Sequence, residues 1–299
     1  MKFHLALGLL PLVAQAVNIV SSNDDGWAEK NIRVLYDSLT AASHRVVISA
    51  PAENQSGTGS FDKTPSNLTS PCEFNSCAAG KAYGSNATQP RWNYVNSYPV
   101  TSMKHGINSV APKFFGGAPD LAVAGPNVGA NIGLAVFFSG TVGATTYAAH
   151  TAQIPGIAFS GVSGDAIAWN ETTPAYSQIY ADLAAKLTDR VVAAGTPYLP
   201  ADTWLNVNFG EVSDSSCTRV DDFQFVLTRI LGAIPLITPD DVETCGGTRL
   251  PTETSVVLRD GCYASVSVGS AADKKDANAT MQAVVLDKLG DLLTCLPSD

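Results

Sequence analysis

The sequence predicts an α/β fold in which a mostly parallel sheet is covered by helices on both faces. Apolar, strand-like runs alternate with helical patterns over most of the chain, and nearly every run ends in a polar loop marked by Gly, Asn or Asp. Such alternation is typical of parallel sheets, because each crossover places a helix against a face of the sheet. The 299 residues are 45% hydrophobic and 15% charged, which is enough apolar material for a sizeable core.

The first strand–helix–strand unit begins at residue 17. The run "VNIVSS" at 17–22 is apolar, partly β-branched and stopped by Asn, Asp and Gly, as expected of a buried strand that meets a turn. From 28 to 42 apolar residues recur at helical spacing, and "HRVVISAP" at 44–51 predicts a second strand. Together these segments predict a right-handed βαβ unit.

The alternation stops between about 61 and 98 and then resumes. The interrupting stretch is rich in Ser, Asn, Pro and Gly, so we interpret it as a glycosylated surface insertion, with room for a short hairpin but outside the core. Beyond it, the pattern predicts helices at 101–110, 139–152 and 175–194, and strands at 119–127, 154–161 and 203–210.

The pattern changes after residue 210. "FQFVLTRI" and "YASVSVGS" predict two strands of a smaller, antiparallel piece, and a closing helix is expected at 279–296. We therefore expect a single domain over 17–299. It would have a core at 17–210, an insertion at about 61–98 and a C-terminal β-hairpin and helix extension at about 211–299.

The first sixteen residues predict secretion. "MKFHLALGLLPLVAQA" has a basic Lys2, a short apolar stretch and the small-residue pattern Ala14-Gln15-Ala16, which is typical of a signal peptide cleaved after Ala16. A membrane anchor is the alternative, but the apolar run is too short to span a bilayer, and no later segment is long and apolar enough. We expect an extracellular protein that is not held in a membrane.

Six cysteines, all beyond the cleavage site, fit that compartment. An even number in an oxidising environment predicts up to three disulfides, of which Cys72–Cys77 is the simplest local pair, while the other pairings stay open. The spacings match no usual zinc pattern. N-glycosylation is expected at four sequons, which begin at Asn67, Asn86, Asn170 and Asn278.

The charge balance argues against a nucleic-acid polymer as the partner. The formal net charge is −9 and no basic run is present, whereas binding along a phosphate backbone requires a positive face. The composition fits a protein that acts on small molecules.

The candidate chemistry lies in loops that follow three predicted strands. Ligands of open α/β sheets bind beyond the carboxyl ends of the strands. The three loops offer side-chain oxygens and no His or Cys. The donors are Asp24 and Asp25 after the first strand, Asn54 and Ser56 after the second, and Asn127 and Asn131 after the strand at 119–127. Asn54 also begins a sequon, but its place in this site predicts that it stays unglycosylated.

Asp24 and Asp25 are adjacent carboxylates, which repel each other unless a cation lies between them. Neighbours on a strand point to opposite faces, so both can reach one ion only where the strand breaks into a turn, and Gly26 provides that turn. Oxygen ligands suit Mg²⁺ or Mn²⁺, with Ca²⁺ as a further option. Because Asn-Asp-Asp-Gly is also good turn and helix-cap chemistry, the motif alone leaves a structural role open.

A phosphate could be held at the start of the helix at 139–152. Free N–H groups and the positive end of the helix dipole favour an anion beside Ser139, Gly140 and Thr141. Ser139 is the expected N-cap of this helix, and an ordinary cap without a bound anion is the alternative.

Taken together, these motifs resemble the SurE family of metal-dependent phosphatases and nucleotidases. The matching segments occur in the family's order: "SNDDG" at 22–26, "APAENQSGTGS" at 50–60, "PDLAVAGPNVGANIG" at 119–133, "FFSGTVGATTYAA" at 137–149 and "LNVNFG" at 205–210. "GCYASVSVGS" at 261–270 resembles a later strand of the family only weakly. The family usually has Ser-Gly-Ile-Asn where this chain has Ala124-Gly125-Pro126-Asn127, and the proline predicts a stiffer loop.

The resemblance implies a Rossmann-like three-layer fold, with a C-terminal extension often exchanged between subunits of a homodimer or homotetramer. It also implies removal of phosphate from nucleoside monophosphates or other phosphomonoesters by a water that the metal activates, as in secreted fungal acid phosphatases. By motif, the metal ligands would be Asp24, Asp25, Ser56 and Asn127, with Asp24 or Asp25 as the proton acceptor. The phosphate contacts would be Ser139, Gly140 and Thr141, with Asn54 and Asn131 nearby.

Two other functions remain as alternatives. A secreted serine esterase would need a G-x-S-x-G elbow, which this chain lacks; "SGVSGD" at 160–165 comes nearest. A non-catalytic module that binds metal or nucleotide would use the same residues as the phosphatase, so only an assay separates these two.

Overall fold

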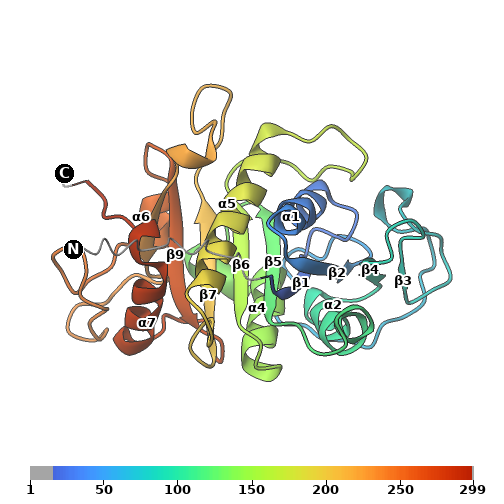
Figure 1. The fold of residues 1–299 in the computed structure, drawn as a ribbon, viewed down its shortest axis with the longest axis horizontal. Helices are drawn as coiled ribbons and strands as arrows, with labels where there is room; N and C mark the ends of the chain where they lie inside the picture. Colours follow the sequence, from blue (N-terminus) through green and yellow to red (C-terminus); the bar gives the residue numbers. More distant parts are fainter. Residues whose placement is uncertain (1–15, 298–299) are drawn as a thin grey trace, which may run out of the picture.

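The structure, a computed structural model, describes residues 16–297 and shows an α/β/α arrangement of three layers (Figure 1). Its sheet has the strand order β3-β4-β2-β1-β5-β6-β7-β9-β8. The strands are β1 (Asn18–Ser22), β2 (Arg45–Pro51), β3 (Tyr83–Ser85), β4 (Trp92–Val95), β5 (Leu121–Val128), β6 (Gly156–Gly161), β7 (Thr203–Phe209), β8 (Gln224–Thr228) and β9 (Tyr263–Ser270). The expected signal peptide lies almost wholly outside the described residues.

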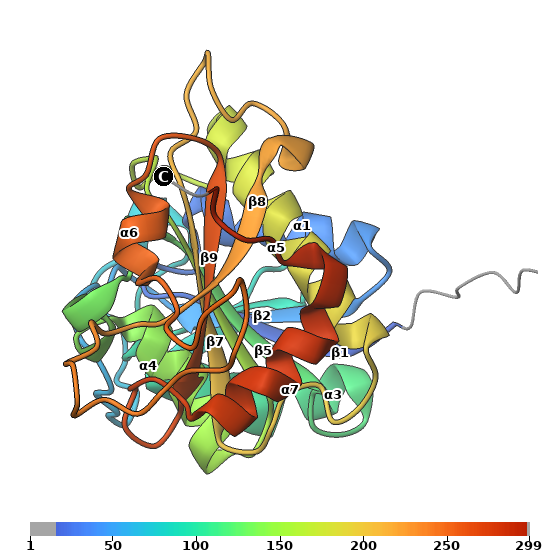
Figure 2. The ribbon, with the colours of Figure 1, turned by 90° about the vertical axis from the view of Figure 1, so that its left-hand side faces the viewer.

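Helices cover both faces of the sheet. Figure 2 shows α1, α5 and α7 on one side, and α4 and α6 on the other. The helices are α1 (Lys30–Ala41), α2 (Pro99–His105), α3 (Ala111–Phe115), α4 (Gly140–Thr146), α5 (Ala175–Ala193), α6 (Glu253–Val257) and α7 (Ala279–Leu289). A single π turn continues α2 at Gly106–Val110 and another continues α4 at Tyr147–Thr151. Within residues 16–297, none of the helices combines the length and apolar character that a membrane crossing requires.

The central strands are buried on both faces, as their continuous apolar runs predict. On β1, Ile19 packs into the cluster formed with α1, α5 and α7, while the next residue, Val20, packs into the cluster formed with α2 and α4. Strands β2, β1, β5, β6 and β7 pair in parallel, so their carboxyl ends meet at one edge of the sheet. This edge receives the predicted site loops.

The insertion at 61–98 contributes to the core, contrary to the sequence expectation. Its strand β4 pairs in parallel with β2, and β3 pairs with β4 in antiparallel fashion, so the expected hairpin extends the main sheet. Tyr94 and Val95 are buried. The strand β4 has only four residues and lies in a stretch rich in Ser, Asn and Gly. So short a local pattern does not predict pairing with β2, which lies more than forty positions away in the sequence.

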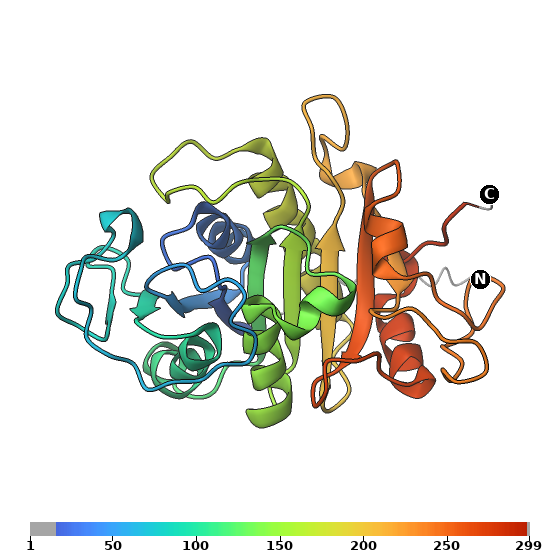
Figure 3. The same ribbon diagram turned by 180° about the vertical axis from the view of Figure 1, so that it is seen from behind.

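The C-terminal strands are not a separate hairpin. The prediction that these two strands form an antiparallel piece is wrong, because β8 pairs in parallel with β9, and β9 pairs in antiparallel fashion with β7 of the predicted core. Figure 3 shows β9 continuing the main sheet beside β7, and β8 follows β9 as the edge strand. Local patterns identify strand residues, but the long connection from β8 to β9, which contains the unpredicted α6, decides their direction. The final helix also ends early, at Leu289.

Three disulfides join all six cysteines: Cys72–Cys77, Cys217–Cys262 and Cys245–Cys295. The first confirms the local pairing expected from the sequence. Disulfides of this number are typical of proteins that fold in an oxidising compartment. The sequon residues Asn67, Asn170 and Asn278 are exposed and Asn86 is half-buried, so glycosylation stays a prediction.

Removing the Cys245–Cys295 disulfide should lower stability without impairing the site. These cysteines are 50 positions apart, and a cross-link over such a loop contributes about 2–4 kcal/mol by restricting the unfolded chain. We expect the double variant C245S/C295S to lose about that much free energy of unfolding in urea titrations. Unchanged unfolding would contradict the expectation.

Candidate active site

The loop after β1 presents two buried carboxylates at the carboxyl edge of the sheet. Asp24 is 2% exposed and Asp25 is 3% exposed. Gly26 has a φ of +114°, and the Asn23 side chain brackets it, donating to the Gly26 carbonyl (2.8 Å) and accepting from its N–H (3.2 Å). This turn breaks the alternation of the strand, as predicted for two neighbours that serve one site.

Asp24 is bound to the start of α4. The Gly140 N–H donates to Asp24 Oδ2 (3.0 Å), and the Thr141 hydroxyl donates to Oδ1. Ser139 caps the helix, as predicted, because its Oγ accepts from the Val142 N–H (3.1 Å). The polar groups of Gly140 and Thr141 are thus directed at Asp24, and the phosphate contact expected from them stays a prediction.

A substitution tests this close approach. A Cβ atom at Gly140 would lie 2.8 Å from Asp24 Cβ and 2.8 Å from Pro99 Cγ, so the helix start must move away. We expect Gly140→Ala to destabilise the protein by about 1–3 kcal/mol and to lower activity. Gly117→Ala is the matched control, because nothing lies within 4 Å of its added Cβ. Equal thermal midpoints for the two variants would contradict the prediction.

Asp25 and Asn127 meet Asp24 at the end of β5. The Val128 N–H donates to Asp25 Oδ2 (3.0 Å). The Asn127 amide donates to the carbonyls of Val128 (3.0 Å) and Gly129 (2.7 Å), so its Oδ1 is turned toward the Thr141 hydroxyl, 3.4 Å away. Because that hydroxyl also contacts Asp24, two carboxylates and an amide oxygen from distant segments lie together.

The loop after β2 lies against the same turn. Its Gln55 N–H donates to the Asp24 carbonyl (2.7 Å), and the Trp27 N–H donates to the Pro51 carbonyl (2.8 Å). Ser56, next to Gln55, is exposed, and its N–H donates to Asn54 Oδ1 (2.8 Å). The backbone therefore brings Ser56 and Asn54 to the site, while no hydrogen bond joins either side chain to the carboxylates within the described residues.

Asn131 belongs to a buried polar network that the sequence did not reveal. Its Nδ2 donates to Ser160 Oγ (2.9 Å), its N–H to Asn208 Oδ1 (2.8 Å), and its carbonyl accepts from Asn206 Nδ2 (2.8 Å). Glu253 of α6 completes the network by accepting from the Gly133 N–H (2.8 Å) and Asn206 (2.9 Å). The sequence signal that could have revealed this network is the pair of Asn residues at alternate positions of the otherwise apolar run "LNVNFG".

The electrostatics of the Asp pair favour a cation. Burial raises the pKa of Asp24, which its bonds from Thr141 and Gly140 partly offset. Burial and the charge of Asp24 raise the pKa of Asp25 to about 7. Two buried, mutually repelling carboxylates are the situation that a divalent cation relieves. Residues 16–297 contain no group of three or more His, Cys, Asp and Glu placed to hold a metal, so the remaining donors would be neutral oxygens, as hard cations accept.

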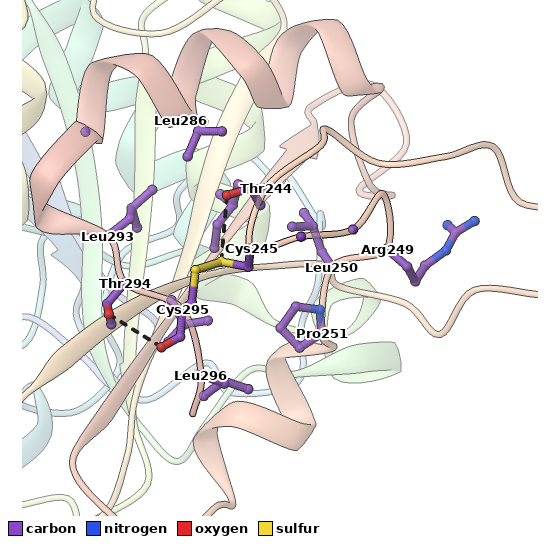
Figure 4. Close-up of a pocket in the computed structure, with 15 residues that line it drawn as sticks. Thr244, Cys245, Arg249, Leu250, Pro251, Leu286, Leu293, Thr294, Cys295 and Leu296 are labelled. Atoms are coloured by element: carbon purple, nitrogen blue, oxygen red, sulfur yellow. Dashed lines mark hydrogen bonds between the residues drawn. A yellow bond between two sulfur atoms is a disulfide. The ribbon is translucent and has the colours of Figure 1, made fainter. Parts of the chain in front are cut away.

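A large cavity lies elsewhere, beside the edge strand β8. Its volume is about 560 Å³, and Figure 4 shows the Cys245–Cys295 disulfide in its wall together with Leu250, Leu286 and Leu293. Four strands separate β8 from β1, and none of the predicted site residues lines this cavity. Cavity size therefore does not locate the candidate site.

Comparisons with known proteins identify relatives of this chain. The family model "Survival protein SurE" matches residues 19–231. An acid phosphatase of Yarrowia lipolytica is 34% identical over 283 residues, which cover 84% of this chain and 78% of that protein. A 5'-nucleotidase SurE of Desulfatibacillum aliphaticivorans is 29% identical over 260 residues, which cover 84% of this chain and 92% of that protein.

A solved structure shares the fold. The SurE protein from Aquifex aeolicus superimposes with a TM-score of 0.61 and 22% identity, over 90% of this chain and 98% of that one. The family match begins in β1 and runs past β8, so it spans all the loops that meet at Asp24 and Asp25. On the strength of this match and of the Yarrowia relative, the chain belongs to the SurE family.

Proposed function

We propose that this protein is a secreted, divalent-metal-dependent phosphatase that acts on nucleoside monophosphates or other phosphomonoesters. The observation that carries the proposal is that Asp24 and Asn127 Oδ1 both contact the Thr141 hydroxyl, while the N–H of Val128, the residue after Asn127, binds Asp25. The relatives named acid phosphatase and 5'-nucleotidase SurE support the reaction class. Mg²⁺ and Mn²⁺ suit this oxygen donor set best, with Ca²⁺ as a further option.

Asp24, Asp25 and Asn127 would hold the cation, with Ser56 as a fourth ligand from the exposed loop. A bound divalent cation supplies charge neutralisation for the phosphate and lowers the pKa of a water molecule. Gly140 and Thr141 fix the orientation of Asp24, because they bind one oxygen each. Asn127 is fixed by the two carbonyls that accept its amide protons.

Asp25 is the better candidate for accepting the proton of the attacking water. Its Oδ2 accepts from Val128, which leaves Oδ1 available, whereas both oxygens of Asp24 accept hydrogen bonds. A general base must reach the proton that it removes, so the free oxygen is decisive. Ser139 and the exposed Asn54 would contact the phosphate, while Asn131 would hold its loop against β6 and β7.

An assay with metal removed tests the function. The protein is expressed in a host that secretes it, and its hydrolysis of p-nitrophenyl phosphate and of a panel of nucleoside monophosphates is measured. Each measurement is made with and without EDTA, and then again after Mg²⁺ or Mn²⁺ is added back. Turnover that EDTA abolishes and metal restores supports the proposal. Metal binding without turnover would favour the non-catalytic module, and EDTA-resistant ester cleavage would favour an esterase. Within residues 16–297, no histidine hydrogen-bonds to a serine, so no nucleophile–base pair for an esterase is formed.

The exposed apolar side chains beyond β8 support self-association. Ile234, Leu236 and Ile237 are 56%, 107% and 74% exposed. An apolar patch of this kind is favoured at contacts between subunits. We propose a homodimer or homotetramer, which gel filtration with light scattering would measure.

A further inference from the structure

A small disulfide-closed loop of the insertion reaches the candidate site. Cys72 and Cys77 close it, and Cys72 is buried in the same core cluster as Trp27 and Tyr94. Inside the loop, the Cys72 N–H donates to the Cys77 carbonyl (3.1 Å), and Ser76 donates to the Glu73 carbonyl through its N–H (3.1 Å) and its hydroxyl (2.8 Å). These bonds give the backbone of Glu73 a defined place.

The Glu73 side chain lies between the two loops that carry the Asp pair and Ser56. A Cβ atom on Gly26 would overlap Glu73 Oε1 and lie 2.7 Å from Oε2, so the carboxyl group covers the face of Gly26. The N–H groups of Ala28 and Asn54 lie close enough to the carboxyl to lower its pKa against the larger effect of burial, which raises it to about 8. Glu73 thus contacts the turn after Asp25 through its carboxyl group, and it contacts the loop that leads to Ser56 through its N–H, which donates to the Ala52 carbonyl (3.4 Å).

The side chain of Arg33 is a buried positive charge near this carboxyl group. The Arg33 guanidinium lies 4.8 Å from the ring centroid of Trp27 and 4.1 Å from that of Trp92, and its charge interacts with Glu29 and Glu73. Glu73 Oε1, Glu29 Oε1 and two Arg33 nitrogens are buried without a hydrogen-bond partner among the described residues. Buried polar groups without partners cost stability, so their retention beside the site calls for a function.

We propose that Glu73 is a positioning residue for the Asp24–Asp25 metal site, and that the Cys72–Cys77 disulfide keeps it in place. The inference rests on the proposed function. Gly26 follows Asp25 directly and Asn54 precedes Ser56 by two positions, so a shift of Glu73 moves ligands on both loops. Glu73 is not itself a ligand in this assignment, because no three acidic groups of the described chain converge on one point.

The effect should be that of other groups that orient metal ligands. Loss of such a partner typically weakens metal binding by about 10–100-fold. Glu73→Ala should therefore raise the Kd for Mn²⁺ by about 10–100-fold, measured by isothermal titration calorimetry on metal-free protein. Glu73→Gln keeps the shape and one accepting oxygen, so its Kd should fall between those of Glu73→Ala and wild type.

Activity gives a second readout that a merely structural defect would not reproduce. If Glu73 acts through the metal ligands, Glu73→Ala should need more Mn²⁺ for half-maximal release of p-nitrophenol, while kcat recovers at saturating Mn²⁺. The double variant C72S/C77S should show the same shift in a milder form. C245S/C295S is the matched control, because it removes a disulfide beside β8 and should leave the Kd for Mn²⁺ unchanged.

The outcomes separate this inference from the proposed function. Absence of Mn²⁺ and Mg²⁺ binding by the wild-type protein would overturn both. Wild-type binding together with an unchanged Kd in Glu73→Ala and C72S/C77S would overturn the positioning role alone. Should Glu73→Ala fail to fold, the Kd values of Glu73→Gln and C72S/C77S decide the question in the same way.

Discussion

Asp25→Asn is expected to abolish most metal-stimulated phosphate release, lowering kcat/KM by about 10²-fold or more. In the proposed mechanism the amide would remove a negative charge from the cation and would remove the proton acceptor, since Asp25 Oδ1 is the carboxylate oxygen left free by the Val128 N–H. The variant should fold, because the Asn oxygen can still accept from Val128. Loss of a buried charge that repels Asp24 should make the metal-free protein more stable at neutral pH.

Rates with p-nitrophenyl phosphate at saturating Mn²⁺, together with thermal midpoints in EDTA, measure both expectations. Asp287→Asn is the matched control, because Asp287 is exposed on α7 and takes no part in the candidate site. Near-normal turnover by a folded Asp25→Asn would show that this carboxylate is not in the metal site. Loss of turnover in the control would show that the assay reports a general effect of charge.

Glu253 is expected to make the protein less stable as pH rises. Burial raises its pKa from 4.5 to about 8, so the folded state holds the proton more tightly than the unfolded state. The stabilisation is complete below about pH 4.5 and is lost as pH rises toward 8, and a difference of this size corresponds to several kcal/mol. Burial also raises the pKa values of Asp25 and Glu73, so these groups should add to the loss of stability of the metal-free protein as pH rises toward 8.

Glu253→Gln isolates this contribution. The amide oxygen can still accept from the Gly133 N–H, but the group no longer ionises. Urea unfolding of metal-free protein at pH 5 and pH 8 should show a smaller loss of stability in the variant than in wild type. Equal losses in both proteins would mean that Glu253 is not protonated preferentially in the folded state.

The local structure around the candidate site was predictable where it follows from short stretches of sequence. The run at 17–22 followed by Asn-Asp-Asp-Gly predicts a strand that ends in a turn, and the structure has that turn at Gly26. Ser139 was predicted as a helix cap and is one. Strand-then-loop order predicted that Asn127 would approach Asp24, because parallel strands end at one edge of the sheet. These inferences need only short-range propensity and the geometry of parallel sheets.

Other parts of the site depend on contacts between distant segments. Glu73 and Glu253 lie in regions that the sequence suggested were peripheral, yet each carboxyl group is buried against a site loop. The raised pKa values of these two carboxyl groups result from burial, which backbone N–H groups of other segments partly offset. Residue type and spacing do not encode those surroundings.

The sequence by itself determined the α/β class, the turn at Gly26 and the Cys72–Cys77 pair, because each follows from periodicity, residue chemistry or proximity along the chain. Only the tertiary structure decided that β4 joins the central sheet, that β8 runs parallel to β9 and that Gly140 and Thr141 hold Asp24. The physical reason is that strand direction and burial depend on which distant segments pack together. Local patterns leave that choice open, and the packing of the whole chain decides it.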